Sequence, residues 1–210
     1  MDFEFTKEQL QVRDMVREWA NRAVAPYIQE WDAKQEKHPE VLYQMGELGI
    51  LGLPIPERYG GSGLDYVSYG LACEELEAVD TFLRVVMSVH VGLNSLALLQ
   101  WASEAQKQRW LVPQARGEKI ATFGLTEPNA GSDAGATRTT ARLEDGEWVV
   151  DGAKIFITNA GTDISACVTI TARTGEDEVS NLIVPNGTPG YEVSPPMKMQ
   201  EKDIPIRARL

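Results

Sequence analysis

The chain has 210 residues, 43% of them hydrophobic, and 31 acidic against 20 basic residues give it a net charge of −11. This length accommodates one large domain or two small ones, each with its own core. The acidic balance disfavours a nucleic-acid or anionic-membrane surface, because phosphate binding needs concentrated Lys and Arg. An anionic ligand would therefore be held locally, by backbone N–H groups of glycine turns or helix N-termini.

The first residues predict an amphipathic helix and then a second one. Thr6 and Gln9 have capping-box spacing, and apolar residues recur every three or four positions until the chain reaches Pro26. Pro39 suits the first turn of the next helix. After a connector rich in glycine and proline, Asp65 is a good N-cap for a third helix.

A long and mostly apolar segment opens at Asp80, and a helix of this kind is usually central in a domain. Ser103 and Gln106 repeat the capping-box spacing and predict a short helix through Trp110, before Pro113. No uninterrupted apolar run approaches the ~20 residues that a membrane span needs, and the acidic N-terminus lacks the apolar core of a secretory signal. We therefore expect a cytoplasmic protein without a membrane span.

After Gly117 the periodicity changes to short β-prone runs separated by turn signals. The expected strands cover residues 120–126, 137–143, 148–150, 154–158, 166–172 and 181–184. Helices followed by strands predict an α+β chain of two domains, with the boundary near Gly117. Cys73 and Cys167 lie far apart in apolar stretches, which is typical of small buried hydrophobes rather than of a disulfide framework.

The most informative stretch is the loop Thr-Glu-Pro-Asn-Ala-Gly-Ser-Asp at residues 126–133. Gly131 lets the backbone approach a ligand closely, Ser132 supplies a hydroxyl, and Thr126 adds another beside the apolar Phe123 and Leu125. A flat heteroaromatic ring with polar edges and a phosphate tail would suit such a loop. The alternative is an ordinary connection whose polar side chains satisfy their own backbone through Asx and Ser/Thr turns.

A second segment, Lys-Ile-Phe-Ile-Thr-Asn at residues 154–159, places an aromatic residue and a hydroxyl around Ile157 just before a turn. By itself this pattern predicts an ordinary half-buried strand. His38 and His90 are better explained as structural residues than as general bases, because a satisfied structural histidine is more common in such positions. Metal-ligand spacing is absent from the sequence.

Together the two segments resemble the acyl-CoA dehydrogenase family, whose middle domain carries a T-E-P-x-A-G-S-D loop and a K-x-W-I-T-N strand. A third match, to the family's P-x-x-Y-G-G-x-G turn, falls at residues 54–63. The resemblance covers residues 3 to 199 approximately. It implies an all-α N-terminal domain over residues 1–118 and a β-barrel-like or β-sandwich middle domain over 119–210, incomplete or altered after about residue 199.

The same resemblance implies FAD as the cofactor. In this family the equivalents of Thr126 and Thr158 hydrogen-bond the flavin ring, and the loop up to Ser132 reaches the polar edge of the cofactor and the acyl thioester. The residues carried over as cofactor-binding candidates are Phe123, Leu125, Thr126, Gly131, Ser132, Phe156, Ile157 and Thr158. Ser132 is also the substrate-binding candidate. Phe156 stands where the family more often has Trp, so it keeps an aromatic face but lacks the indole donor.

The implied reaction is α,β-desaturation of an acyl-CoA thioester, with a hydride passing to flavin N5 and an electron-transferring flavoprotein reoxidising the flavin. The family's catalytic Glu belongs to a C-terminal four-helix domain that these residues do not include. No catalytic residue is therefore expected here, and Glu127 is expected to be structural. The full-length protein is expected to be a homotetramer. The alternatives are a non-catalytic acyl-CoA- or flavin-binding or assembly paralogue and, less favoured, a flavin oxidase.

Overall fold

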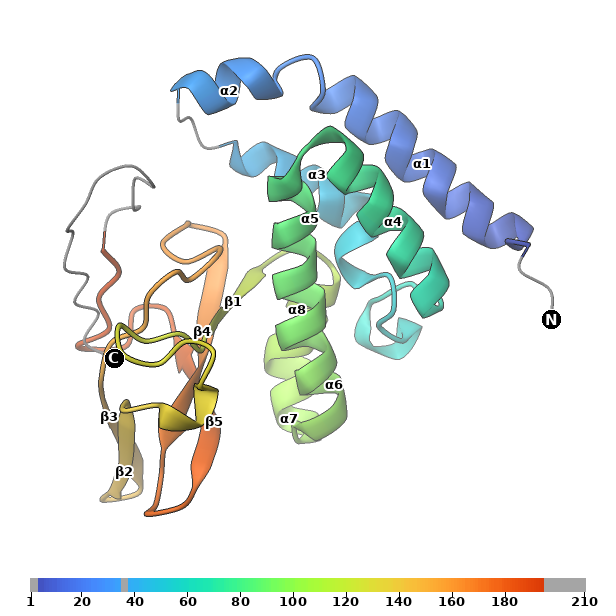
Figure 1. The fold of residues 1–210 in the computed structure, drawn as a ribbon. Coiled ribbons are helices and arrows are strands. Elements are labelled where there is room, and N and C mark those ends of the chain that lie inside the picture. The colour runs from blue at the N-terminus through green and yellow to red at the C-terminus, as the bar shows by residue number, and fades with distance from the viewer. Residues whose placement is uncertain (1–3, 35–37, 195–210) are drawn as a thin grey trace. The chain divides into compact units, whose positions relative to one another are not determined.

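The computed structural model describes residues 4–34 and 38–194, and the chain divides into two units, Met1–Ile120 and Ala121–Leu210. The first unit is helical. The second contains a mixed β-sheet (Figure 1). The predicted fold class, an α-helical part followed by a β part, is confirmed.

The helices of the first unit follow one another with short connections. In chain order they are α1 (Lys7–Ala23), α2 (Ile28–Lys34), α3 (Pro39–Glu47), η1 (Ile50–Gly52), η2 (Glu57–Tyr59), α4 (Tyr66–Val79), α5 (Thr81–Met87), η3 (Ser88–Ser95), α6 (Leu96–Trp101), α7 (Glu104–Gln106), η4 (Lys107–Leu111) and α8 (Val112–Ala115). The short helix α2 was not expected from the sequence, and it has no buried residue that an apolar pattern could have revealed.

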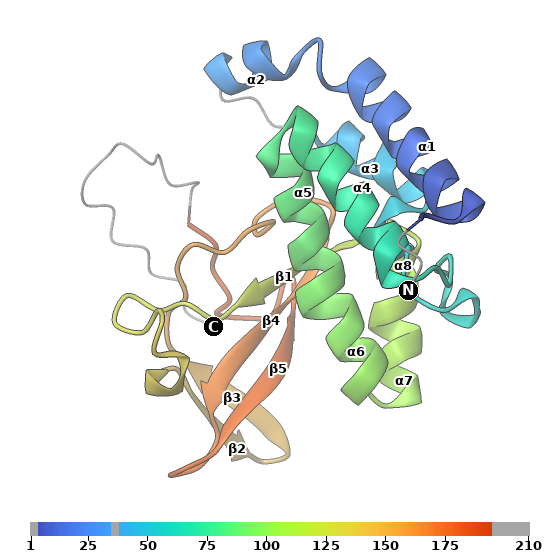
Figure 2. The ribbon, with the colours of Figure 1, turned by 45° about the vertical axis from the view of Figure 1, so that its right-hand side comes forward.

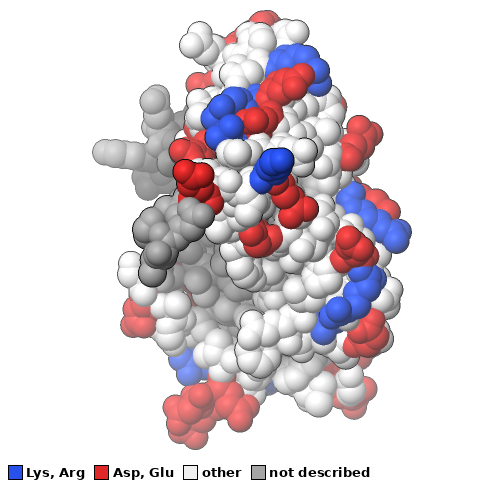
Figure 3. Space-filling view, turned by 90° about the vertical axis from the view of Figure 1, so that its right-hand side faces the viewer, with Lys and Arg blue, Asp and Glu red and all other residues white. Residues whose placement is uncertain are grey.

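Helix α1 begins where the capping box predicts. The backbone N–H of Gln9 donates to Thr6 Oγ1 at 3.2 Å, and the N–H of Thr6 donates to Gln9 Oε1 at 2.9 Å. The helix lies along α4 (Figure 1), and Arg17 binds the carboxylate of Glu75 on α4 through two hydrogen bonds of 2.6 and 2.8 Å. On the face shown in Figure 3, basic and acidic side chains are interspersed.

The predicted short helix from Ser103 continues beyond its expected end. Ser103 and Gln106 form the capping box, but the helical stretch runs on through η4 and α8 to Ala115 and therefore includes Pro113. Pro113 lies in the first turn of α8, after the π-helical turn η4. Pro113 lacks the backbone N–H that a regular helix interior uses, and it lies where the hydrogen-bond pattern changes from π-helical to α-helical.

By length and composition alone, the continuous helix Thr81–Trp101 is long and apolar enough to cross a membrane, although polar residues such as Arg84 and Asn94 interrupt its apolar run. Of its apolar window, 44% is buried inside the folded chain. Fully buried His90 approaches the backbone oxygen of Gln114 with Nε2 at 3.0 Å. Burial lowers the pKa of His90 to about 4, so this histidine is neutral at physiological pH, in keeping with its expected structural role.

The second unit contains a five-stranded sheet. Its strands are β1 (Ile120–Gly124), β2 (Thr140–Glu144), β3 (Glu147–Asp151), β4 (Ser165–Arg173) and β5 (Val179–Pro185). The strand order is β1-β4-β2-β3, and β5 pairs with β4 in an antiparallel ladder (Figure 2). Val168, Ile170 and Val184 form the core of this sheet. The β2–β3 hairpin turns through Asp145 and Gly146, both with positive φ, as a two-residue turn of type I′ requires.

The strand expected over residues 154–158 is wrong, because the structure has an irregular segment there. Phe156 and Asn159 have φ angles of 59° and 70°. A positive φ lies outside the extended region of the backbone map, so these residues cannot continue a pleated ladder. The prediction of a strand rested on the side-chain pattern of these residues, and that pattern carries no information about the sign of φ.

Candidate functional site

The loop that follows β1 is closed at its base by the side chain of Glu127. This residue is only 5% exposed. Its carboxylate accepts hydrogen bonds from Thr137 Oγ1 at 2.5 Å, Arg138 N at 2.7 Å and Thr139 N at 3.0 Å. Residues 127–139 therefore form a closed loop, called the Glu127 loop below, whose ends meet on one carboxylate. The tip of the loop, residues 131–135, is exposed.

Lys154 is the cationic partner of Glu127, and its side chain is only 2% exposed. Its Nζ lies 2.8 Å from Glu127 Oε1. Three neutral acceptors surround the same atom: Thr171 Oγ1 at 3.0 Å, Thr137 Oγ1 at 3.1 Å and Leu125 O at 3.2 Å. An ammonium has three protons, so each of them has an acceptor. Because Thr171 belongs to β4, Lys154 connects the Glu127 loop to the sheet.

Burial and hydrogen bonding act in opposite directions on this pair. Burial by itself would raise the pKa of Glu127, but the hydrogen bonds from Lys154, Thr137, Thr139 and Arg138 lower that pKa to about 2. Burial also lowers the pKa of Lys154, and the neighbouring Glu127 carboxylate opposes this shift. A carboxylate with such a low pKa is a weak base at neutral pH, in agreement with the structural role expected for Glu127.

The low pKa of Glu127 predicts that acid destabilises the second unit. A carboxyl group whose folded-state pKa lies below its unfolded value of 4.5 stabilises the fold above pH 4.5, and this contribution is lost as the pH falls towards 2. We expect the difference in unfolding free energy between the natural chain and Glu127→Gln to be constant near neutral pH and to shrink between pH 4.5 and 2. Urea denaturation followed by circular dichroism measures the two unfolding free energies at each pH. A difference that stays constant down to pH 2 would contradict the assignment.

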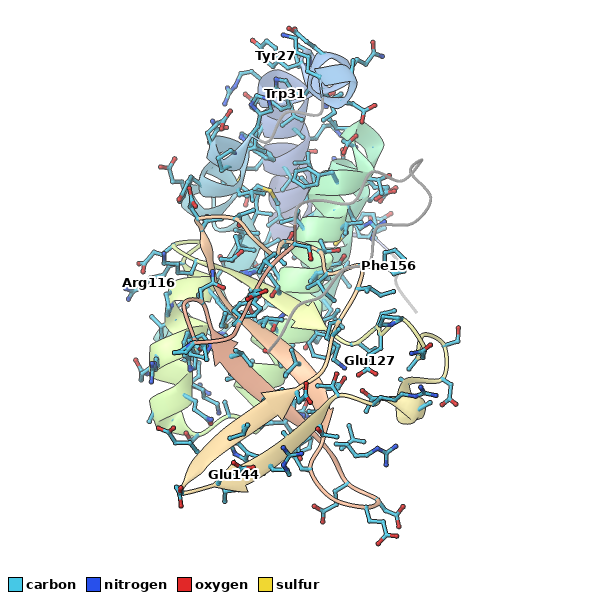
Figure 4. The ribbon with its side chains drawn as sticks, turned by 90° about the vertical axis from the view of Figure 1, so that its left-hand side faces the viewer. Tyr27, Trp31, Arg116, Glu127, Glu144 and Phe156 are labelled. Atoms are coloured by element: carbon cyan, nitrogen blue, oxygen red, sulfur yellow. The ribbon has the colours of Figure 1, made fainter. Side chains whose placement is uncertain are left out.

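The segment at residues 154–158 lies directly beside the start of the Glu127 loop. The backbone N–H of Ile155 donates to the carbonyl oxygen of Thr126 at 2.8 Å. The next residue, Phe156, is 63% exposed despite its large apolar side chain. Figure 4 labels Phe156 and Glu127 on neighbouring segments of the second unit. The structure thus brings two of the candidate residues, Thr126 and Phe156, together from positions far apart in the sequence.

The other candidates are distributed around this pair. Ile157 is half-buried and packs against the core of the sheet. Phe123 and Leu125 are half-buried at the end of β1, and Gly131 and Ser132 lie at the exposed tip of the Glu127 loop. Thr158 is half-buried. The structure therefore separates the candidates into an inner part near Thr126 and an outer loop tip.

The residues present fit a flat heteroaromatic ligand with polar edges. Phe156 offers an exposed aromatic face, and its positive φ is the kind of local strain that concentrates at ligand sites. Within the part of the chain that the structure describes, the hydroxyls of Thr126, Ser132 and Thr158 hydrogen-bond to no other residue. A Cβ atom added at Gly131 would meet no atom within 4 Å, so the chain itself leaves space at the loop tip.

Sequence reasoning missed the residues that hold the site together. Lys154 is part of the motif at residues 154–159, but it was not among the candidates, although a lysine followed by three apolar residues in four is a signal for a partly buried cation. Arg173 was missed too. Its guanidinium donates to the carbonyl oxygens of Gly135 and Thr137 at the end of the Glu127 loop. No local signal identifies this contact, because Arg173 lies 38 positions from Gly135.

Comparisons with known proteins agree with the motifs. The family model described as acyl-CoA dehydrogenase, N-terminal domain, matches residues 6–118, and that described as acyl-CoA dehydrogenase, middle domain, matches residues 122–207. A short-chain specific acyl-CoA dehydrogenase of Clostridium acetobutylicum is 42% identical over 210 residues, which cover 99% of this chain and 54% of that protein.

Solved structures show the same fold. A chain from the structural work on the electron transferring flavoprotein of Acidaminococcus fermentans matches with a TM-score of 0.88 and 38% identity, over 91% of this chain and 51% of that one. The glutaryl-CoA dehydrogenase of Mycobacterium smegmatis in complex with FADH2 matches with a TM-score of 0.84 and 34% identity, over 90% and 48%. The chain therefore spans about half the length of the relatives it matches.

Proposed function

This chain belongs to the acyl-CoA dehydrogenase family, and on that premise we propose that it forms the N-terminal domain (1–118) and middle domain (119–210) of an FAD-dependent enzyme. The proposed reaction is α,β-desaturation of an acyl-CoA thioester. The observation that carries the proposal is the hydrogen bond from Ile155 N–H to Thr126 O, which places the start of the Glu127 loop beside the segment with the exposed Phe156. The FADH2 complex of the Mycobacterium smegmatis relative supports the cofactor.

In the proposed reaction, the residues of this chain bind and orient the flavin and the substrate. Thr126 and Thr158 donate hydrogen bonds to the polar edge of the flavin ring, and Phe156 packs beside it. Gly131 and Ser132, at the loop tip, face the polar edge of the cofactor and the thioester of the substrate. When bound, the flavin supplies the hydride acceptor. Abstraction of the α proton is assigned to a Glu of the family's C-terminal domain and to no residue of this chain.

The proposed partners follow from the family as well. The substrate is an acyl-CoA, and the name of the Clostridium acetobutylicum relative favours a short acyl chain. The proposed electron acceptor is an electron-transferring flavoprotein, a protein named in the work on the Acidaminococcus fermentans structure. We further propose a homotetramer for the full-length protein and a cytoplasmic location.

Replacing either threonine hydroxyl is expected to weaken FAD binding. Thr126→Val and Thr158→Val keep the shape of the side chain but remove one hydrogen bond, and a neutral hydrogen bond contributes about 0.5–1.5 kcal/mol, which corresponds to a two- to twelvefold loss of affinity. Titration with FAD, followed by flavin fluorescence and absorbance, measures the change. Thr169→Val, an isosteric replacement on β4, is the matched control and should bind like the natural chain.

The titration tests the assigned hydroxyls, and a turnover assay of the full-length protein separates the proposal from its rival. Unchanged FAD affinity in both variants would show that these hydroxyls do not contact the flavin. Binding of acyl-CoA without turnover, in the full-length protein supplied with FAD and an electron acceptor, would favour the non-catalytic binding or assembly protein. Desaturation of the acyl-CoA under those conditions supports the dehydrogenase.

A further inference from the structure

We propose that Lys154 is a positioning residue, which holds the Glu127 loop and the segment at residues 154–158 in the relative position that the ligand needs. This inference rests on the proposed function, because it assigns a task to a residue behind the proposed flavin-binding groups. Lys154 itself is buried and touches no ligand in this scheme. Its effect passes through the backbone at Thr126 and through the carboxylate of Glu127.

The first step of the argument is the closure of the loop. The Glu127 carboxylate accepts hydrogen bonds from the side chain of Thr137 and from two backbone N–H groups at the far end of the Glu127 loop. A carboxylate with these donors fixes the distance between the two ends of the loop. The conformation of the exposed tip, which carries Gly131 and Ser132, therefore depends on the position of this one carboxylate.

The second step is the connection between the loop and its neighbouring segment. Lys154 Nζ donates to Glu127 Oε1 and to the carbonyl oxygen of Leu125, while the adjacent N–H of Ile155 donates to the carbonyl oxygen of Thr126. Two consecutive residues of one segment thus bind three consecutive residues of the other. Contacts at several points restrict both the separation and the rotation of the two segments, which a single hydrogen bond cannot do.

The third step is a comparison with the other anchor of the loop. Arg173 donates to the carbonyl oxygens of Thr137 at 3.3 Å and Gly135 at 3.2 Å, and so it holds the far end of the loop against the end of β4. Both anchors hold the loop to the sheet, since Lys154 also binds Thr171. Lys154 additionally belongs to the segment that carries Phe156. Its loss should therefore change the position of Phe156 relative to Thr126, whereas Arg173 has no such link.

The chemistry of the buried ammonium supports positioning rather than simple packing. An apolar side chain of similar length would fill the same space without the desolvation cost of a buried charge. It would not supply the directional hydrogen bonds that the three ammonium protons distribute among four acceptors on three parts of the chain, namely the start of the loop, its end and β4. Second-layer residues of this kind set the geometry of the groups that touch a ligand.

The test compares Lys154→Met with the double variant Glu127→Gln/Lys154→Met, in which no charge is left buried without a partner. The control is Arg142→Met, an exposed cation on β2 whose partner Glu144 is also exposed. Amide hydrogen exchange at Ile155 reports, without any ligand, whether its hydrogen bond to Thr126 is kept. The core amide of Ile170 is the internal reference. FAD titration with the flavin absorbance spectrum reports the consequence for binding.

We expect at least about tenfold faster exchange at Ile155, relative to Ile170, in both Lys154 variants. FAD affinity should fall about 10- to 100-fold, the range that loss of an outer-layer supporting residue costs at metal sites. The double variant should recover stability without recovering either property. Normal exchange and normal affinity in a stable double variant would overturn the proposal. If the full-length protein binds no FAD, the proposed function fails, and the exchange data alone still decide whether Lys154 sets the position of the segment at residues 154–158 relative to the Glu127 loop.

Discussion

Glu127→Ala is expected to reduce the unfolding free energy of the second unit by about 3–5 kcal/mol, the range for breaking a buried ion pair from one side. The change leaves the ammonium of Lys154 buried without its anionic partner. It also removes the acceptor of the backbone N–H groups of Arg138 and Thr139. Each buried donor left without a partner adds its own desolvation cost. Urea denaturation followed by far-ultraviolet circular dichroism measures the loss.

The matched control for this change is Glu144→Ala. Glu144 lies at the end of β2, next to the hairpin turn (Figure 4), and it forms an ion pair with Arg142 at 3.3 Å. Both side chains are more than half exposed, and exposed ion pairs contribute about 0–1 kcal/mol. If Glu127→Ala cost no more than Glu144→Ala, the Glu127 carboxylate would not hold the loop together.

Gly61→Ala is expected to destabilise the first unit by about 3 kcal/mol or more, because the added methyl group has no space. A Cβ atom at Gly61 would lie 2.1 Å from the carbonyl oxygen of Ile55 and 2.5 Å from that of Gly52. These two oxygens accept hydrogen bonds from Gly63 N and Ser62 N, at 2.8 and 3.0 Å. The backbone must move to relieve the clash, and that movement breaks the hydrogen bonds of the turn.

Gly70→Ala is the matched control in the same unit. Gly70 lies within α4, and a Cβ atom there would meet nothing within 4 Å. Alanine has the higher helix propensity, so this change should be neutral or stabilise by up to about 1 kcal/mol. Thermal unfolding followed by circular dichroism compares the two variants. Equal melting temperatures for Gly61→Ala and the natural chain would show that the turn at residues 52–63 adapts without cost.

Much of the helical unit could be predicted because its signals are local. The capping boxes at Thr6 and Ser103 each span four residues, and the sequence alone identifies both helix starts. Asp65 was likewise recognisable as the cap of α4. The spaced motifs of the second half also identify the family from their residues alone. Such inferences succeed because the interacting groups lie within one turn of each other, or because the motif itself is contiguous.

The structure was needed wherever the interacting groups lie far apart in the chain. Glu127 and Lys154 are 27 positions apart, and neither residue by itself indicates that the other will be its buried partner. Residues 154–158 look like a strand because side-chain alternation does not report the sign of φ at Phe156. Local signals in the sequence thus sufficed to predict the helices and to recognise the family motifs. Tertiary packing decided the buried ion pair and the backbone turn that bring Thr126 beside Phe156. Only the folded chain excludes water from Lys154, and its hydrogen bonds to the few acceptors nearby are stronger there than in water.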